Sequence, residues 1–202
     1  MIKLPFEILN EVKDYVIFKP TTKIELQNAV NLWCKSKDEA LNKYGYISNW
    51  DTSLIEDMSE LFKEKNNFND NISIWDVSNV KNMAKIFVNC ENFNQSLNKW
   101  NTVNVTDMSR MFLNCKNFNQ PLNNFNVSKV TNMKHMFANC KYFDQPLNKW
   151  NTNNVINMIG MFFNCENFNQ SLNDWNISNG TNIIEMFDRC EKLNNIPHWY
   201  KQ

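Results

Sequence analysis

Six cysteines and two histidines are the side chains of this 202-residue chain with the most specific chemistry, because thiols in such number could ligate zinc, form disulfides or act as nucleophiles. Neither His135 nor His198 falls in a metal-binding pattern, and no C-x-x-C pair occurs. Five cysteines recur at intervals of 25 residues, at Cys90, Cys115, Cys140, Cys165 and Cys190. Ligands in such a line do not converge on one ion, so we expect no metal and no cofactor. A disulfide between neighbouring units is conceivable on distance alone, but five thiols cannot all pair. We therefore predict reduced, buried cysteines and a reducing compartment.

Positive charge is the second feature with a chemical meaning. Lysine and arginine together number 21, as do aspartate and glutamate, so no global charge favours nucleic acid or a membrane surface. Residues 99–149 nevertheless hold seven basic residues against Asp107 and Asp144, a net charge of +5 between acidic flanks. Such a run is usually a solvated face, but it could also meet an acidic protein. The partner-binding candidates are Lys99, Arg110, Lys116, Lys134, His135, Lys141 and Lys149.

Catalytic motifs do not occur in the sequence. There is no glycine-rich phosphate loop, no nucleophile elbow and no motif of paired carboxylates. The acidic stretch LIEDMSELFKEK is expected to be the polar face of the first repeat helix. We therefore predict that the protein is not an enzyme.

A strict 25-residue repeat positions these residues. Its tryptophan column is Trp50, Trp75, Trp100, Phe125, Trp150 and Trp175, with Trp199 or Tyr200 near the next place. Methionine, two phenylalanine and leucine columns keep the same spacing, and 39 asparagines fill much of the remainder. Self-similarity at this period is typical of a solenoid, in which each unit buries its apolar side against its neighbours. We expect buried aromatic columns, and asparagines that bond from one coil to the next.

The spacing inside one unit predicts its local structure. Met108, Met111, Phe112 and Cys115 stand at i, i+3, i+4 and i+7, one stripe of a helix that Thr106 could cap. Proline within the next segment excludes helix there, which favours an extended arm with one short strand near PLN. We expect successive strands to pair in parallel at about 4.8 Å.

The unit M-F-x-x-C-x-x-F-N-Q-x-L-x-x-W-N-x-x-x-V-x-x-M resembles the repeat of the BspA-like leucine-rich-repeat family, known from bacterial surface lipoproteins and large DNA viruses. The resemblance covers about 145 residues. It implies an α/β leucine-rich-repeat-like solenoid, here of about six coils with one short helix and one short parallel strand each, that serves binding or adhesion without catalysis. Surface members usually carry export signals, whereas this chain begins with MIKLPFEILNEVKDYV, which contains acidic residues.

Two domains are predicted: a helical N-terminal cap at residues 1–47 and the repeat solenoid at 48–202, with a degenerate last coil. The start Leu4-Pro5-x-Glu7-Ile8-Leu9 also resembles the opening of an F-box, which would dock a substrate adaptor onto a cullin ubiquitin ligase. A capping helix is the alternative. No signal peptide and no stretch of about 18 apolar residues is present, so we expect an intracellular protein, in the cytoplasm or, if viral, in host cytoplasm or virion.

The sequence thus favours a non-catalytic protein-protein interaction scaffold, plausibly viral, that binds through variable positions 84–85, 109–110 and 134–135. Two alternatives stay open: an F-box-type adaptor, and a structural or surface component in which solenoids stack on one another. The partner is expected to be a protein of acidic character, and the scaffold to be a monomer or self-associating.

Overall fold

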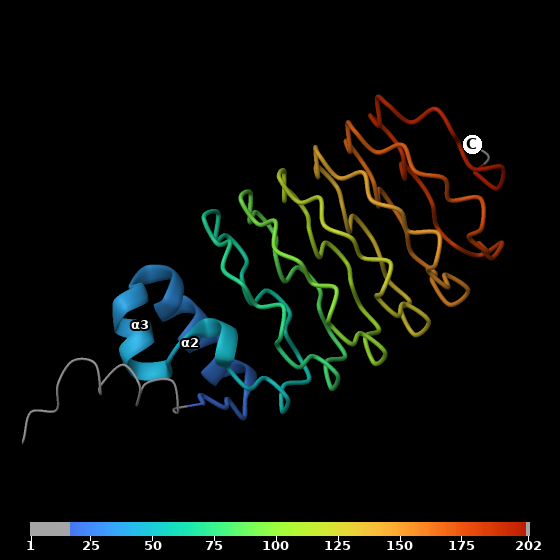
Figure 1. Cartoon of the computed structure of the whole chain (residues 1–202). Coiled ribbons are helices and arrows are strands. Elements are labelled where there is room, and N and C mark those ends of the chain that lie inside the picture. The colour runs from blue at the N-terminus through green and yellow to red at the C-terminus, as the bar shows by residue number, and fades with distance from the viewer. Residues whose placement is uncertain (1–16, 201–202) are drawn as a thin grey trace, which may run out of the picture.

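The computed structural model describes residues 17–200 as two α-helices followed by a stack of coils (Figure 1). Helix α2 spans Lys23–Lys35 and α3 spans Lys37–Tyr44, and a 3-10 turn, η1, follows at Ile47–Asn49. The helices stand at one end of the stack and the C-terminus lies at the other (Figure 1). The F-box-like segment and the first candidate helix, PFEILNEVKDYV, lie outside the described residues.

Helix α2 forms for reasons visible in its sequence. Thr22 accepts a hydrogen bond from the N–H of Glu25, and the Glu25 carboxylate bonds back to the Thr22 N–H, which makes a capping box. Its buried residues, Leu26, Ala29, Val30 and Trp33, recur at helical spacing. Ile24 of the same helix lies off this stripe and is 72% exposed.

The helices are joined to the first coil by an aromatic cluster. Trp50 makes edge contacts with Trp33 and Phe18 at ring separations of 5.9 and 5.2 Å, and Tyr44 lies 4.5 Å from Phe18. Trp50 also stacks on Trp75 at 6.0 Å, so the cluster continues into the tryptophan column. The N-terminal segment and the repeat therefore share one hydrophobic core.

The predicted α/β architecture is wrong. Within residues 17–200 the repeat contains neither an α-helix nor a strand, and α2 and α3 both precede it. Parallel pairing is limited to isolated bridges between one residue of each coil and its equivalent in the next, from Asp57 with Asn82 to Asn157 with Asn182. The short strand expected near PLN does not form, so the leucine-rich-repeat-like geometry implied by the family resemblance does not hold.

A chain of tight turns replaces the predicted helix of each coil. We call it the turn ribbon, and it spans residues 57–64, 82–89, 107–114, 132–139, 157–164 and 182–189. In the third ribbon, Met111 donates its N–H to the carbonyl of Met108, and Leu113 to that of Arg110. Arg110 and Asn114 have φ of 55° and 63°, the left-handed region that interrupts an α-helix.

The remaining N–H groups of the ribbon bond along the stack. Those of Met108, Arg110, Phe112 and Asn114 donate to carbonyls of the next coil at 2.8–2.9 Å. Alternate peptide groups thus serve the turn and the neighbouring coil, and the N–H of Ser109 donates to the Asp107 carboxylate. Thr106, expected to cap a helix, instead donates its N–H and hydroxyl to the carbonyl of Lys81 in the preceding coil.

Side-chain columns fill the interior as the repeat predicts. Phe87, Phe112 and Phe137 stack at 5.6 Å, and the second phenylalanine column stacks at 5.9–6.1 Å. The tryptophan column is 2–3% exposed from Trp50 to Trp175, which confirms its prediction as core. Because the phenylalanine rings of both columns stack on the equivalent rings of neighbouring coils, the core is continuous from coil to coil.

Candidate partner-binding face

The cysteine column is structural. Cys90, Cys115, Cys140 and Cys165 are fully buried, and all six cysteines are free thiols, as predicted. Each column thiol donates to the carbonyl of the first-column phenylalanine in the preceding coil, as Cys115 does to Phe87 at 2.9 Å. Burial raises the pKa of Cys90 to about 12 and raises those of Cys115, Cys140 and Cys165 well above the usual value of a thiol. These groups stay protonated at neutral pH and are poor nucleophiles.

Asparagine side chains bond between coils, as the sequence suggested. The side-chain oxygens of Asn69, Asn94, Asn119 and Asp144 each accept the backbone N–H of the equivalent residue one coil on, at 2.9–3.0 Å. A second ladder was missed by the sequence reasoning: Asn89, Asn114, Asn139 and Asn164 are linked amide to amide at 2.5–2.9 Å. All four have φ near 60°, a left-handed backbone that asparagine tolerates better than most residues. Their strict 25-residue spacing was the signal in the sequence.

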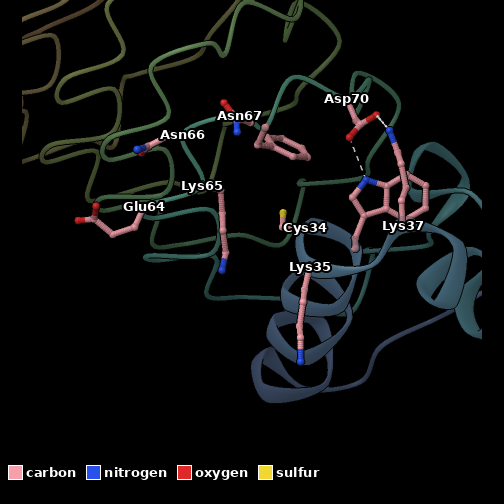
Figure 2. A pocket seen from close by; sticks show the side chains of 10 residues that line it. Cys34, Lys35, Lys37, Glu64, Lys65, Asn66, Asn67 and Asp70 are labelled. Carbon is pink, nitrogen blue, oxygen red and sulfur yellow. Dashed lines mark hydrogen bonds and ion pairs between the residues drawn. The ribbon is translucent and has the colours of Figure 1, made fainter.

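One concave pocket lies where α2 meets the first coil (Figure 2). It has a volume of about 580 Å³. Asp70 accepts hydrogen bonds from Trp33 Nε1 at 2.9 Å and Lys37 Nζ at 2.6 Å, which ties the helices to the coil. Burial raises the pKa of the Cys34 thiol in its wall to about 11, so the pocket contains no activated nucleophile. Among residues 17–200 no cluster of side chains could hold a metal ion.

The basic candidates occupy three positions of the coil. Lys99 and Lys149 directly precede the tryptophan column, Lys116 and Lys141 share one register position beyond the ribbon, and Arg110, Lys134 and His135 belong to the turn ribbon. The candidates therefore fall at three register positions, and Lys99 and Lys149 lie two coils apart.

Lys116 and Lys141 already have carboxylate partners. Lys116 pairs with Glu91 at 3.0 Å and Lys141 with Glu166 at 2.9 Å, each one coil away. Both pairs are exposed and contribute little to stability, but they neutralise the charge that an acidic partner would meet. For Lys99, Arg110, Lys134 and Lys149 no ion pair is formed with any residue from 17 to 200.

Each coil presents two adjacent residues at the same position of its turn ribbon: residues 59–60, 84–85, 109–110, 134–135, 159–160 and 184–185. We call these six pairs the ribbon face. The N–H of Lys85 donates to the carbonyl of Ser109, that of Arg110 to Lys134, and that of His135 to Ile159. These bonds set the pairs side by side along the stack. Their side chains change from coil to coil, whereas the core columns scarcely vary.

The ribbon face changes in character along its length. Glu60 and Lys85 neutralise each other at 2.7 Å, the unpaired Arg110 and Lys134 form the basic middle, and the last two coils present Ile159 and Ile184. Ile184 is 61% exposed, and Ile159 is half-buried. A partner that combines a carboxylate with an apolar side chain would match this order.

His135 lies between the basic and apolar parts. Its Nδ1 is 3.3 Å from the carbonyl oxygen of Gly160, one coil on. Burial lowers the pKa of His135, the hydrogen bond to Gly160 opposes that shift, and Lys134 and Arg110 reinforce it. The ring is therefore neutral at pH 7, and its Nδ1–H donates to the carbonyl in the tautomer that makes this bond.

A family model described as "Mycoplasma protein of unknown function, DUF285" matches residues 33–141 and again residues 121–202. No curated protein and no solved structure matches the chain. Within residues 17–200, neither α-helix is long and apolar enough to cross a membrane.

Proposed function

Because the chain belongs to the DUF285 family, whose description names no function, we propose from its surface that it is a non-catalytic scaffold for protein-protein interaction. Its coils would hold the side chains of the ribbon face in a fixed order, and an acidic partner would bind to them. The resemblance to BspA-like repeat proteins supports a binding role, although the fold that it implied is not the one observed. Free thiols support a place inside the cell.

The observation that carries the proposal is the position of Arg110 and Lys134 on neighbouring coils. The N–H of Arg110 donates to the carbonyl of Lys134 at 2.8 Å, so the two residues are fixed side by side, and neither side chain has an acidic partner within residues 17–200. Ile159 follows in the next coil. Two free cations beside an apolar side chain favour a peptide in which acidic residues precede a large apolar one.

The experiment is a selection of peptides against the full chain from a library of random 12-residue peptides. We expect enrichment of acidic-apolar sequences, with an affinity that falls as salt is raised. Reversing both charges, Arg110→Glu with Lys134→Glu, should weaken the selected peptides at least tenfold, since an attraction then becomes a repulsion.

The matched control reverses two other unpaired lysines, Lys99→Glu with Lys149→Glu. It changes net charge equally but leaves the ribbon face intact. Equal loss in both variants would mean that net charge alone governs binding, and it would refute the ribbon face as the site. Failure to enrich any acidic-apolar peptide would refute the proposed partner class.

A further inference from the structure

The turn that precedes the sixth ribbon differs from the equivalent turns of the other coils. In those coils a buried valine or isoleucine donates its N–H to the carbonyl three residues before it, as Val155 does to Thr152 at 3.0 Å. Gly180 stands at this position in the sixth coil and has no side chain to bury. The turn there closes one residue later, through a hydrogen bond from the Thr181 N–H to the Ser178 carbonyl at 3.0 Å. The N–H of Gly180 therefore bonds to no acceptor within residues 17–200.

The side chain before this glycine also lacks the bond that its equivalents make. Asn79, Asn104 and Asn154 hold the same position in other coils, and each donates its side-chain amide to a carbonyl of the preceding coil at 2.7–2.8 Å. Asn179 makes no such bond, either to the preceding coil or to any other residue from 17 to 200. Both Asn179 and Gly180 are exposed. In the other coils the two bonds that are missing here run to earlier residues of the chain.

The chemistry of an asparagine that precedes a glycine gives these two free groups a meaning. The backbone nitrogen after an asparagine can attack the side-chain carbonyl carbon, Cγ, and close a cyclic imide. Glycine favours this attack because no β-carbon stands beside its nitrogen. A nitrogen whose N–H is bound to an acceptor is less available to attack, and so is an amide that is held in a hydrogen bond. Residues 179–180 are the one Asn-Gly pair in the 202-residue sequence, and the fold leaves both of its reacting groups free.

We propose that Asn179 and Gly180 form a site of self-modification, at which the folded chain converts the Asn179 amide into a carboxylate. The Gly180 nitrogen bonds to Cγ of Asn179, the Cγ–Nδ2 bond breaks, and Nδ2 leaves as ammonia with the proton of the Gly180 N–H. Water then opens the imide in one of two ways. Opening at Cγ gives aspartate, and opening at the backbone carbonyl carbon gives isoaspartate. The reaction needs water alone, and it is independent of the proposed binding function.

Modification would change both the charge and the backbone of the sixth coil. Isoaspartate continues the main chain through its β-carbon, which adds one atom to the turn that the Thr181–Ser178 hydrogen bond closes. This turn is bound to the preceding coil, because Thr181 Oγ1 donates to the carbonyl of Val155 at 2.8 Å. The N–H of Asn182 likewise donates to the carbonyl of Ile156 at 2.9 Å. Isoaspartate should therefore loosen the turn and speed amide exchange at both of these donors, Thr181 and Asn182.

The test incubates the full folded chain at neutral pH and follows its asparagines by peptide mapping with mass spectrometry. We expect Asn179 to gain the mass that replaces an amide with a carboxylate, as a mixture of aspartyl and isoaspartyl products. Asn79, Asn104 and Asn154 should stay unmodified over the same time. Because the fold leaves both groups free, the rate at Asn179 should lie within tenfold of the rate in urea. Gly180→Ala should slow the reaction at least tenfold, and the space around Gly180 accepts the added methyl group.

Asn179→Asp is the matched control for the effect on the turn. It adds the same charge as modification but no backbone atom, so amide exchange at Thr181 and Asn182 should stay as in the unmodified chain. Faster exchange in the isoaspartyl chain alone would support the proposal. Three results would overturn it: a rate at Asn179 more than tenfold below that in urea, aspartate as the single product, or an equal rate in Gly180→Ala. Unchanged exchange in the isoaspartyl chain would refute the loosening of the turn.

Discussion

The imidazole ring of His135 occupies the place where a side chain on Gly160 would stand. A methyl group built on Gly160 collides with Nδ1 and Cε1 of that ring, and Gly160 has φ of +54°. Every other residue described at this register position has a side chain and a positive φ, from Glu60 to Glu185. Glycine is thus needed at residue 160 because of its neighbour on the preceding coil as well as its backbone.

Replacing this glycine should therefore destabilise the protein. For Gly160→Ala we expect a loss of about 1–2 kcal/mol in the free energy of unfolding, from left-handed backbone alone. Displacement of the His135 ring adds to the loss. Urea denaturation measures both, and the double variant with His135→Ala should recover the second part.

Gly180→Ala is the matched control within the chain. A β-carbon at Gly180 meets nothing within 4 Å. We expect no loss there, and a gain of at most about 1 kcal/mol from a less flexible unfolded chain. Equal losses at the two glycines would contradict the account of Gly160.

Stability should also depend on the protonation of His135. Burial lowers its pKa from 6.5, so the unfolded state binds the proton more readily than the folded state does. The contribution of the neutral ring is complete above pH 6.5 and is lost as the pH falls from there through the lowered value. Lys134 and Arg110 disfavour the charged ring as well, whereas Glu185 favours it.

Urea denaturation of the wild type and His135→Gln between about pH 7.5 and pH 5 tests this dependence. This pH range lies above the pKa of carboxylates such as Glu60, which is lowered from 4.5. Titration of these carboxylates therefore does not contribute to the difference. The wild type should lose stability relative to the variant as the pH falls. Parallel curves would show that His135 carries no such linkage.

Thiol reactivity should follow burial along the cysteine column. Only thiolates react, and burial both hides the four inner sulfurs and raises their pKa. In native protein at about pH 8 we expect a disulfide reagent to modify Cys34 slowly, then Cys190, with Cys90 to Cys165 modified only after unfolding. Cys34→Ser should remove the first phase alone. Rapid modification of a third thiol in native protein would contradict the fold.

The sequence determined the repeat and the buried columns, because core contacts between equivalent residues impose one residue type at each place. It could not distinguish the turn ribbon from a helix. Met108, Met111, Phe112 and Cys115 are buried at helical spacing in either structure. The turn ribbon forms because its N–H groups bond to carbonyls of another coil, about 24 residues away. Local periodicity carries no information about hydrogen bonds at that separation.

The candidate site was predictable only in part. Variation at residues 84–85, 109–110 and 134–135 pointed to positions that the structure sets side by side. The pairing of Lys116 with Glu91 was not predicted, although the two residues are one repeat apart.

Asn139 offers a direct test of turn ribbon against helix. Its φ is 61°, and its amide group donates to Asn114 at 2.7 Å and accepts from Asn164 at 2.9 Å. Asn139→Gly loses these hydrogen bonds, at a cost of about 0.5–1.5 kcal/mol each. Asn139→Ala loses the same hydrogen bonds and keeps a β-carbon in left-handed backbone, a strain of about 1–2 kcal/mol that glycine relieves.

Alanine should therefore be the worse substitution at residue 139. In a helix the order would be opposite, because alanine is more stable there than glycine by about 1 kcal/mol. The sign of the difference between the two variants, measured by urea denaturation, decides between the two structures without a further structure determination. A more stable alanine variant would restore the helix that periodicity predicted.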